Sequence, residues 1–598
     1  MHNTFTTVFI TLPQRGSPSF FPPLGPLAVI NALKKHSYEN IHFYNIDVLR
    51  PSRKEAIEHI VSLHPDVVAI SAPVSTAYDN GRFFSKELKK VLPNIKIILG
   101  GNMTASAEII LRGTGVDYCV IGEGEKVTCE LFDRIQTKNP PADLSKIKGL
   151  AYMLDGRFIC TGYADQIPEQ QIFDVDWNML DELSVKHYFT PLNELDPLSV
   201  RYKYFFHDDI HVLQSRGAEY AKKTIAIMSC SKGCIGRCTY CHRFTKGIRV
   251  VPVDIVMRRI KELIHRFNIG AIEFSDECFG VSKQWLADFC EAIGGLDIVW
   301  RVGGMRVDAV TTEIIKMMKK AGCRTIVYGV ESGSEQILKI MEKKVSIRQN
   351  INAIKWTVEA GLYTIPQLVI GMPGETTATI KETADFAANA ITISNRQNPG
   401  EVGMTFAQAL PGTPLYEYAR SVGIIGATPE AEEEYLLRIS DKDAADRHST
   451  LNFTEYPRLI MLSWLLLIHI IVSYRYVSIF GKMHFHKILS AGHESDYGSL
   501  AYALRSGRYR SFLSAHPGML YRLRWFVWIV PFLNTLKLDG FAKAWRLLLE
   551  LIGWYIQCAV GKNRSFPFSY KSLRKIITDD MDNAYSGSKE MEILRRGR

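Results

Sequence analysis

The stretch SCSKGCIGRCTYCHRF, Ser229 to Phe244, places four of the chain's 11 cysteines within 12 positions. Cys234, Cys238 and Cys241 have the spacing C-x3-C-x2-C. Three thiolates on one loop can hold three irons of a [4Fe-4S] cluster and leave the fourth iron open to an outside ligand. A structural zinc site is the alternative, but it requires four ligands, usually as cysteine pairs on two separate loops. The spacing therefore favours an iron–sulfur cluster with an open iron, which implies chemistry.

The composition is that of a folded protein with several domains. A chain of 598 residues, 46% hydrophobic and 22% charged, is too long for one core. The N-terminal stretch MHNTFTTVFITLPQRG has no basic region ahead of its apolar run, so we expect no secretory signal and a reducing, cytoplasmic location. In that location a tight cysteine cluster indicates metal binding rather than disulfides.

Residues 1–138 alternate short apolar runs with helical patterns. The runs are TTVFITLP, IHFYNID, DVVAISAP, IKIILGG and YCVIGEGE, and this alternation predicts an α/β, doubly wound, Rossmann-like domain. Ligands of such sheets bind beyond the carboxyl ends of the strands. The candidate binding residues at those ends are Ser71, Gly100, Gly101, Gly122, Glu123 and Gly124.

Three further segments follow. Residues 139–220 are expected to form a linker with a small hairpin at KIKGLAYMLDGRFICTG, and residues 421–598 a helical domain. Between them, residues 221–420 repeat strand and amphipathic helix six times, which predicts a partial (βα)6 barrel. Such barrels carry their chemistry at the carboxyl ends of the strands. The cysteine loop directly follows the first of these strands.

The motifs after the cysteines resemble those of the radical S-adenosylmethionine (SAM) superfamily, within the class that carries an N-terminal cobalamin (B12)-binding domain. The resemblance covers residues 1 to about 420 and rests on FSDECFG, GMRVD, YGVESGS, LVIGMPGET and ALPGTPLYEYA, in the family's order. It implies that the chain binds a [4Fe-4S] cluster through its three cysteines, and SAM. The residues it assigns to SAM are Tyr240, Asp276 or Glu277, Arg306, Glu331, Ser332, Gly371 and Gly374.

Each assignment has a structural alternative. Glu331 and Arg306 could form an ordinary ion pair at the barrel rim, and Tyr240 could be a core residue. Cys230 lies four residues ahead of Cys234, where the family usually has no thiol, and we interpret it as a small buried residue at the end of a strand.

The front domain resembles cobalamin binders through FFPPLGPLAVINAL, AISAPVST, ILGG and VIGEGE. No Asp-x-His-x-x-Gly motif occurs in the chain, so the resemblance implies a cobalamin without a histidine ligand from the protein, and a domain that has lost its corrin stays open as an alternative.

The resemblance implies C-methylation of an unactivated carbon in a small-molecule, lipid or lipid-linked substrate. The cluster would reduce SAM to methionine and a 5′-deoxyadenosyl radical, using an external one-electron reductant of the flavodoxin or ferredoxin type. The substrate radical would then take a methyl group from methylcobalamin, which a second SAM restores. One alternative keeps the cofactors but ends in oxidative cyclisation or ring rearrangement; another is a non-catalytic metal- or lipid-binding scaffold.

The C-terminal quarter is basic and apolar. From residue 451 onward there are 21 Lys and Arg against 10 Asp and Glu, which leaves 51 against 52 in the rest of the chain. The runs LIMLSWLLLIHIIVSY, WFVWIVPFLNTL and LIGWYIQCAV are too short or interrupted to span a bilayer simply, and Trp464, Trp525, Trp528 and Trp554 lie in or beside them. This pattern predicts peripheral contact with the inner face of the membrane rather than with nucleic acid. A buried helical bundle that caps the barrel is the alternative.

Overall fold

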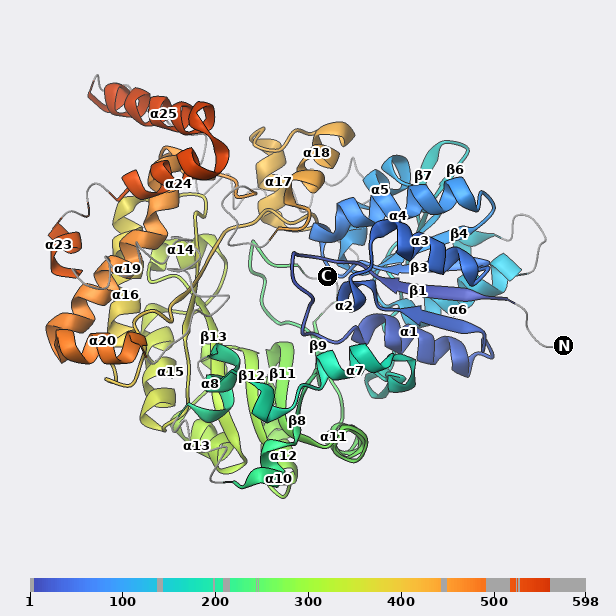
Figure 1. Cartoon of the computed structure of the whole chain (residues 1–598), viewed down its shortest axis with the longest axis horizontal. Coiled ribbons are helices and arrows are strands. Elements are labelled where there is room, and N and C mark those ends of the chain that lie inside the picture. The colour runs from blue at the N-terminus through green and yellow to red at the C-terminus, as the bar shows by residue number, and fades with distance from the viewer. Residues whose placement is uncertain are drawn as a thin grey trace.

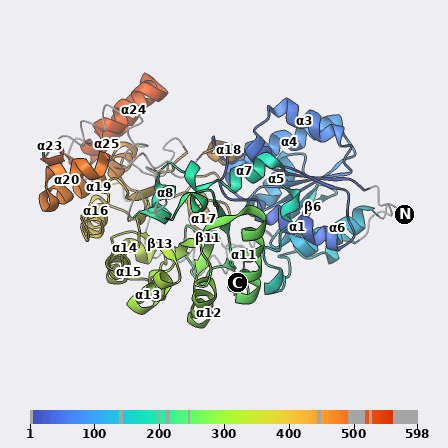
Figure 2. The same ribbon diagram turned by 60° about the horizontal axis from the view of Figure 1, so that its bottom comes forward.

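The computed structural model describes residues 5–136, 143–196, 199–207, 216–242, 245, 247–442, 449–490, 517–522, 524 and 527–559. Two sheets stand next to each other in it, and the C-terminal helices lie at the end of the molecule opposite the front sheet (Figure 1, Figure 2). The predicted α/β class, with a Rossmann-like front domain, a partial barrel and a helical C-terminal region, is confirmed.

The front sheet has seven strands in the order β2 (Ile41–Tyr44), β1 (Thr7–Thr11), β3 (Val67–Ser71), β4 (Lys96–Gly100), β5 (Tyr118–Val120), β6 (Leu150–Leu154) and β7 (Arg157–Cys160). The first five are parallel, as predicted. The hairpin β6–β7, which the sequence analysis places in the linker, instead extends this sheet as antiparallel strands.

Helices cover both faces of the front sheet, and this is why a strand such as β1 is buried at every position. One face carries α1 (Leu24–Lys35) and α6 (Gly124–Gln136); the other carries α3 (Arg53–Ser62), α4 (Tyr78–Val91) and α5 (Ala107–Gly113). The short α2 (Ile46–Leu49) follows β2. The turn after β4 requires glycine, because Gly101 has φ +100° and a Cβ there would lie 2.4 Å from the carbonyl oxygen of Ala72.

The second sheet is the partial barrel, six strands in the order β15 (Gly403–Phe406), β14 (Pro366–Ile370), β13 (Cys323–Glu331), β12 (Val299–Met305), β11 (Ile269–Phe279) and β8 (Thr224–Met228). All neighbours are parallel, as the six predicted strand–helix units require. The helices between them are α11 (Val253–Phe267), α12 (Lys283–Ile293), α13 (Thr312–Lys320), α14 (Glu335–Ile340), α15 (Ile347–Glu359) and α16 (Thr377–Ile391). A small antiparallel pair, β9 (Ser231–Gly233) and β10 (Ile248–Val250), stands where the cysteine loop leaves the barrel.

The connecting segment and the C-terminal region consist of helices. The connecting helices are α7 (Glu182–Tyr188), α8 (Val200–Phe206) and α10 (Ala218–Ala221). After the barrel come α17 (Pro414–Ser421), α18 (Pro429–Ile439), α19 (Arg458–Phe480), α20 (Lys482–Ser490), α23 (Pro517–Arg522), α24 (Ile529–Asp539) and α25 (Phe541–Ala559). Helix α18 binds back to the front domain, where the Tyr78 hydroxyl donates to Glu433 Oε1 at 2.9 Å.

Helix α19 corrects one expectation. It has 23 residues and, among the residues that the structure describes, is the one helix long and apolar enough to cross a membrane. However, 61% of its most apolar stretch is buried inside the protein, because it packs against α16. Trp464 is 1% exposed and His469 is equally buried. The prediction that this run faces a membrane is therefore wrong for α19, which packs against α16 on the side of the barrel. Trp525 lies outside the described residues.

A buried carboxylate ties the two sheets together. Glu123 follows β5 and is 5% exposed. It accepts hydrogen bonds from Arg249 on β10 and from the Ile167 backbone N–H, the latter at 2.7 Å, and Lys232 on β9 lies 3.7 Å away. The candidate cobalamin residue Glu123 is thus placed in a contact between the front domain and the barrel. The two strands that flank the cysteine loop, β9 and β10, therefore each place a basic side chain beside Glu123.

Replacing Glu123 with alanine should destabilise the fold by about 3 kcal/mol, because it leaves the buried Arg249 guanidinium without its carboxylate. Urea unfolding followed by tryptophan fluorescence measures this. Asp165→Ala is the control, since its exposed pair with Lys148 should leave the transition nearly unchanged. Equal transitions for the two variants would mean that Glu123 does not join the domains.

Candidate functional site

The cysteine loop is closed by glycines. Gly233, at the end of β9, has φ +89°, and a Cβ there would stand 2.3 Å from the Gly247 carbonyl oxygen. Gly236 lies between two sulfurs: a Cβ on it would be 3.4 Å from Cys234 Sγ and 3.6 Å from Cys238 Sγ. Its own N–H donates to Cys234 Sγ at 3.2 Å. The loop therefore brings two of the three predicted ligand sulfurs to one glycine-lined space.

The sulfurs differ in their surroundings. The neighbouring Cys278 thiol, and then the Gly236 N–H and the nearby Arg306, lower the pKa of Cys234 to about 6. Cys241 lies apart: its Sγ is 3.5 Å from the His242 carbonyl oxygen and the side chain is exposed. Among the described residues no group of three or more His, Cys, Asp or Glu side chains is close enough to hold a metal ion as it stands. Two cysteine sulfurs on either side of Gly236 nevertheless fit part of an iron–sulfur cluster site.

Asp276 braces the start of this loop. It lies in the C-terminal part of β11 and is 6% exposed. Its Oδ1 accepts from the N–H groups of Cys230 and Ser231 at 3.0 and 2.6 Å and from the Ser231 hydroxyl at 2.6 Å. Burial raises its pKa to about 6. The Cys230 sulfur lies 3.6 Å from Asp276 Oδ2, so Cys230 is a buried end-of-strand residue, as interpreted from the sequence.

Of the two acids considered for the SAM amino group, Asp276 already accepts hydrogen bonds from the backbone of Cys230 and Ser231. The Glu277 side chain is accessible to solvent, yet burial among neighbouring segments raises its pKa. Glu277 is thus the more exposed of the two acids.

Two ion pairs lie at the barrel mouth. Neither of them joins Glu331 to Arg306, the structural ion pair considered in the sequence analysis. Arg306 binds Asp308 with both arms, at 2.9 and 2.8 Å, while Glu331 binds Lys343 at 2.7 Å. Glu331 has φ +61°, an unfavourable conformation for a non-glycine residue. Burial, and then the charge of Glu331, raise the pKa of Tyr240 well above its usual value. Sequence reasoning missed Asp308 and Lys343, because nothing local in the sequence marks them as partners.

The remaining SAM candidates lie on β13 and in the turn after β14. Ser332 is fully buried and its hydroxyl lies 3.1 Å from that of Thr383 on α16. Gly371 and Gly374 both have positive φ, +82° and +76°. Glu375 closes this turn: one carboxylate oxygen accepts from the N–H groups of Gly371 and Met372. The sequence analysis quoted Glu375 within a motif but gave it no role.

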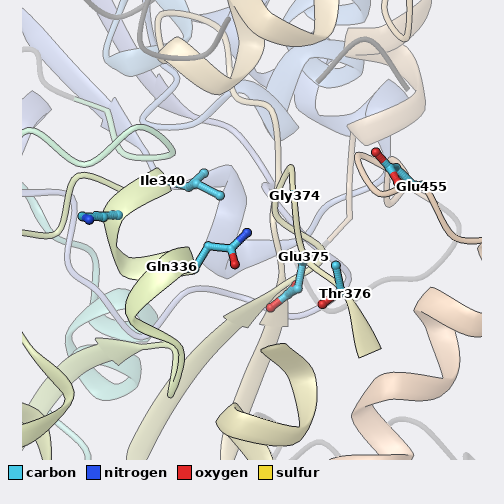
Figure 3. A pocket seen from close by; sticks show the side chains of 7 residues that line it. Gln336, Ile340, Gly374, Glu375, Thr376 and Glu455 are labelled. Carbon is cyan, nitrogen blue, oxygen red and sulfur yellow. The ribbon is translucent and has the colours of Figure 1, made fainter. Parts of the chain in front are cut away.

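A cavity of about 400 Å³ opens between α14 and this turn (Figure 3). Glu375 is one of its lining residues. Its second carboxylate oxygen is buried without a hydrogen-bond partner among the described residues, and burial raises its pKa to about 8. The other lining residues are Gln336, Lys339, Ile340, Gly374, Thr376 and Glu455.

The carboxyl edge of the front sheet offers a second binding region. Ser71 and Gly100 end β3 and β4, and nothing lies within 4 Å of where a Gly100 Cβ would be. Gly122 and Gly124 flank Glu123 in the turn into α6. The hydroxyls of Ser75 and Ser106, just beyond β3 and β4, are buried and have no hydrogen-bond partner among the described residues. Buried hydroxyls without protein partners at this edge fit a polar ligand such as a corrin with its amide arms.

Two family models match these two regions. The radical SAM superfamily matches residues 228–387, and the B12 binding domain matches residues 16–132. The chain is a radical SAM enzyme with a B12-binding domain. These domains imply a [4Fe-4S] cluster, SAM and cobalamin.

Curated relatives of this radical SAM enzyme include an uncharacterized methyltransferase of Pyrococcus horikoshii, 29% identical over 60% of this chain and 70% of that protein. The anaerobic magnesium-protoporphyrin IX monomethyl ester cyclase of Cereibacter sphaeroides is 25% identical over 67% of this chain, and the match spans 60% of the cyclase. Among solved structures, the cobalamin-dependent SAM radical enzyme OxsB with aqua-cobalamin and SAM bound has a TM-score of 0.55 at 15% identity, covering 100% of this chain and 84% of OxsB. This likeness confirms the predicted fold.

Proposed function

We propose that the chain is a cobalamin-dependent radical SAM methyltransferase that acts on an unactivated carbon. The observation that carries this is the proximity of the two binding regions. Gly412 follows the barrel and has φ +82°; a Cβ on it would lie 3.1 Å from Ala105, beside β4 of the front sheet, and 3.8 Å from His242 of the cysteine loop. A substrate held there would be within reach of groups bound to either domain. The relative of P. horikoshii, named as a methyltransferase, supports the same reaction.

We assign Cys234, Cys238 and Cys241 as the cluster ligands. Cys234 and Cys238 already lie on either side of Gly236, and Cys241 follows on the same loop with an exposed side chain. We assign Glu277 to the amino group of SAM and Arg306 to its carboxylate. The other candidate residues at the barrel mouth are assigned to the rest of SAM. The candidate residues at the carboxyl edge of the front sheet are assigned to cobalamin.

When bound, the cluster and cobalamin supply a hydrogen-abstracting 5′-deoxyadenosyl radical and a transferable methyl group. One turnover takes two SAM and two electrons from a flavodoxin- or ferredoxin-type reductant. It converts the substrate C–H to C–CH3 and leaves methionine, 5′-deoxyadenosine and S-adenosylhomocysteine. The chain's own groups hold these parts in place: Asp276 fixes the loop, and Glu123 fixes the loop against the front sheet.

The match to the cyclase makes oxidative cyclisation or rearrangement the second candidate. A non-catalytic scaffold is disfavoured, because the C-x3-C-x2-C set of cysteines is complete.

The ligand assignment predicts that Cys238→Ala loses most of its iron and cleaves SAM more than about 100-fold more slowly. Even the loss of a hydrogen-bond partner of a metal ligand lowers metal affinity or activity by about 10–100-fold. Cys230→Ala should keep both, because its thiol faces Asp276. Anaerobic reconstitution, iron analysis and 5′-deoxyadenosine release measure this. Equal loss in the two variants would overturn the assignment.

The reaction itself is tested with anaerobically reconstituted enzyme, a one-electron reductant, SAM that carries a deuterated methyl group, and a small-molecule and lipid extract. We expect mass spectrometry to find one product in which a CD3 group replaces a hydrogen, with the Cys238→Ala protein as control. A product that has lost two hydrogens and gained no label would instead establish cyclisation.

We further propose a cytoplasmic location at the inner membrane face, with a lipid or lipid-linked substrate. Within the part of the chain that the structure describes, helix α25 presents an exposed apolar stripe at helical spacing, whose members are between 45% and 68% exposed: Phe541, Trp545, Leu549, Ile552 and Ile556. Exposed Leu533 and Leu538 of α24 continue it. Basic Arg522, Arg524, Lys537, Lys543 and Arg546 accompany these helices in the sequence. Apolar side chains and basic groups together suit an anionic lipid surface.

Flotation with anionic liposomes tests this surface. Leu549→Glu should weaken binding about tenfold or more, because one buried leucine is worth roughly 1.5–3 kcal/mol. Arg522→Glu with Arg524→Glu should weaken it too, and the remaining attraction should fall at high salt. Leu183→Glu, at a 62% exposed leucine of α7, is the matched control. If the intact protein never floats, α25 does not bind lipid and the lipid-substrate proposal fails.

A further inference from the structure

The inner face of the barrel sheet, opposite the barrel helices, is polar and opens toward the cysteine loop. Side chains such as Phe274 point to the helices and are fully buried. On the inner face of β11, Glu273 is buried, Ser275 is partly buried and Glu277 is exposed. Gln367 on β14 is exposed as well, although its strand has a neighbour on each side. The carboxyl-terminal part of this face is therefore accessible to a ligand.

Helix α8 closes the other end of the inner face. Figure 2 shows α8 on the opposite side of the strands from α12, α13 and α15. Its Phe205 belongs to one apolar cluster with Ala271 and Val299, at the start of β11 and β12. Two residues farther along these strands, Glu273 and Arg301 form a buried ion pair. Helix α8 and this ion pair form the floor of the inner face.

Arg201 of α8 brings a second guanidinium to this floor. The guanidinium carbon of Arg301 lies 3.9 Å from the centre of the Tyr204 ring. Residues three apart share a helix face, so Arg201 is on the side of α8 that meets Arg301. The guanidinium carbon of Arg201 lies 4.6 Å from the centre of the Phe20 ring, in the loop between β1 and α1. Arg201 therefore stands between the barrel and the carboxyl edge of the front sheet.

The Arg201 guanidinium has no anionic partner among the described residues. It forms no ion pair or hydrogen bond with any of them, and its Nη2 atom is buried. Arg301, by contrast, has Glu273, and Lys203, the other cation of α8, lies 2.5 Å from Glu401. Burial lowers the pKa of Arg201. A cation that is largely withdrawn from water is unfavourable without a counter-ion, so this position favours an anion.

We propose that Arg201 binds an anionic group of the substrate, a carboxylate or a phosphate, while the rest of the substrate extends along the inner face toward the cysteine loop. Two guanidiniums against the one carboxylate of Glu273 leave one positive charge at the floor. A guanidinium presents parallel N–H donors that match two oxygen atoms of either group. The reaction at the far end of the substrate rests on the methyltransferase proposal, whereas the anion site does not.

Thermal unfolding of the full-length, reconstituted protein with saturating SAM tests the site without turnover. Inorganic phosphate and acetate are each titrated against sodium chloride of equal ionic strength. We expect one of them to raise the unfolding midpoint of the wild type in a saturable way. Arg201→Gln should bind that anion roughly 10- to 100-fold more weakly, and Arg201→Lys should lose less. Arg259→Gln, at a partly buried arginine of the outer helix α11, is the matched control and should respond as the wild type does.

Phe20→Leu separates binding from packing. It removes the ring beside Arg201 but keeps the charge, so most of the anion affinity should remain. The inference is overturned if Arg201→Gln responds to both anions as the wild type does. It is also overturned if Phe20→Leu loses the response as fully as Arg201→Gln, because Arg201 would then be only a packing partner.

The methylation assay with deuterated SAM and extract gives a second test. The CD3-labelled product should be retained on an anion-exchange column at neutral pH, and Arg201→Gln should need a higher concentration of extract to form it. A labelled product that passes unretained would overturn the anion site and leave the methyltransferase proposal intact. An anion response that depends on Arg201, without any labelled product, would support the site and contradict the methyltransferase proposal.

Discussion

The buried carboxylate of Glu123 is the constraint on which the arrangement of the two binding regions depends. It stands at the carboxyl end of β5, where a ligand of the front sheet would bind, and it is held by Arg249 and approached by Lys232 on the two arms of the cysteine loop. A carboxylate this deeply buried is tolerated only with its partners in place, because an unpaired charge there would cost several kcal/mol. The loop therefore cannot leave the front sheet without breaking this pair.

Like this ion pair, the apolar core holds the front domain and the barrel together. One continuous cluster runs from the front strands, through Leu12 and Met103, to Met372 and Leu415 beyond the barrel strands. Parallel sheets place ligands at the carboxyl ends of their strands, and here the two sets of carboxyl ends face a common region. A Cβ placed on Gly412 would lie within 4 Å of both Ala105 and His242, so only a thin layer of protein separates the front sheet from the cysteine loop there. The fold thus supplies the proximity that a reaction shared by two cofactors requires.

The sequence predicted what is local or periodic. The alternation of apolar runs and helical patterns predicted both sheets, and the C-x3-C-x2-C spacing with its glycines located the loop that the structure closes at Gly233 and Gly236. Partner choice could not be predicted: Asp308 for Arg306 and Lys343 for Glu331 follow from tertiary packing that no local pattern encodes. The membrane prediction failed for Trp464, since a largely buried helix and a lipid-facing helix can have the same composition.

The central claim is that one site between the two sheets holds the cluster and cobalamin close together. EPR spectra of protein reconstituted with both, with the cluster reduced and the cobalt as Co(II), test it most directly. The account predicts magnetic interaction, seen as broadening and faster relaxation of both signals relative to protein that holds either group alone. Spectra equal to the sum of the two single-cofactor spectra would contradict it.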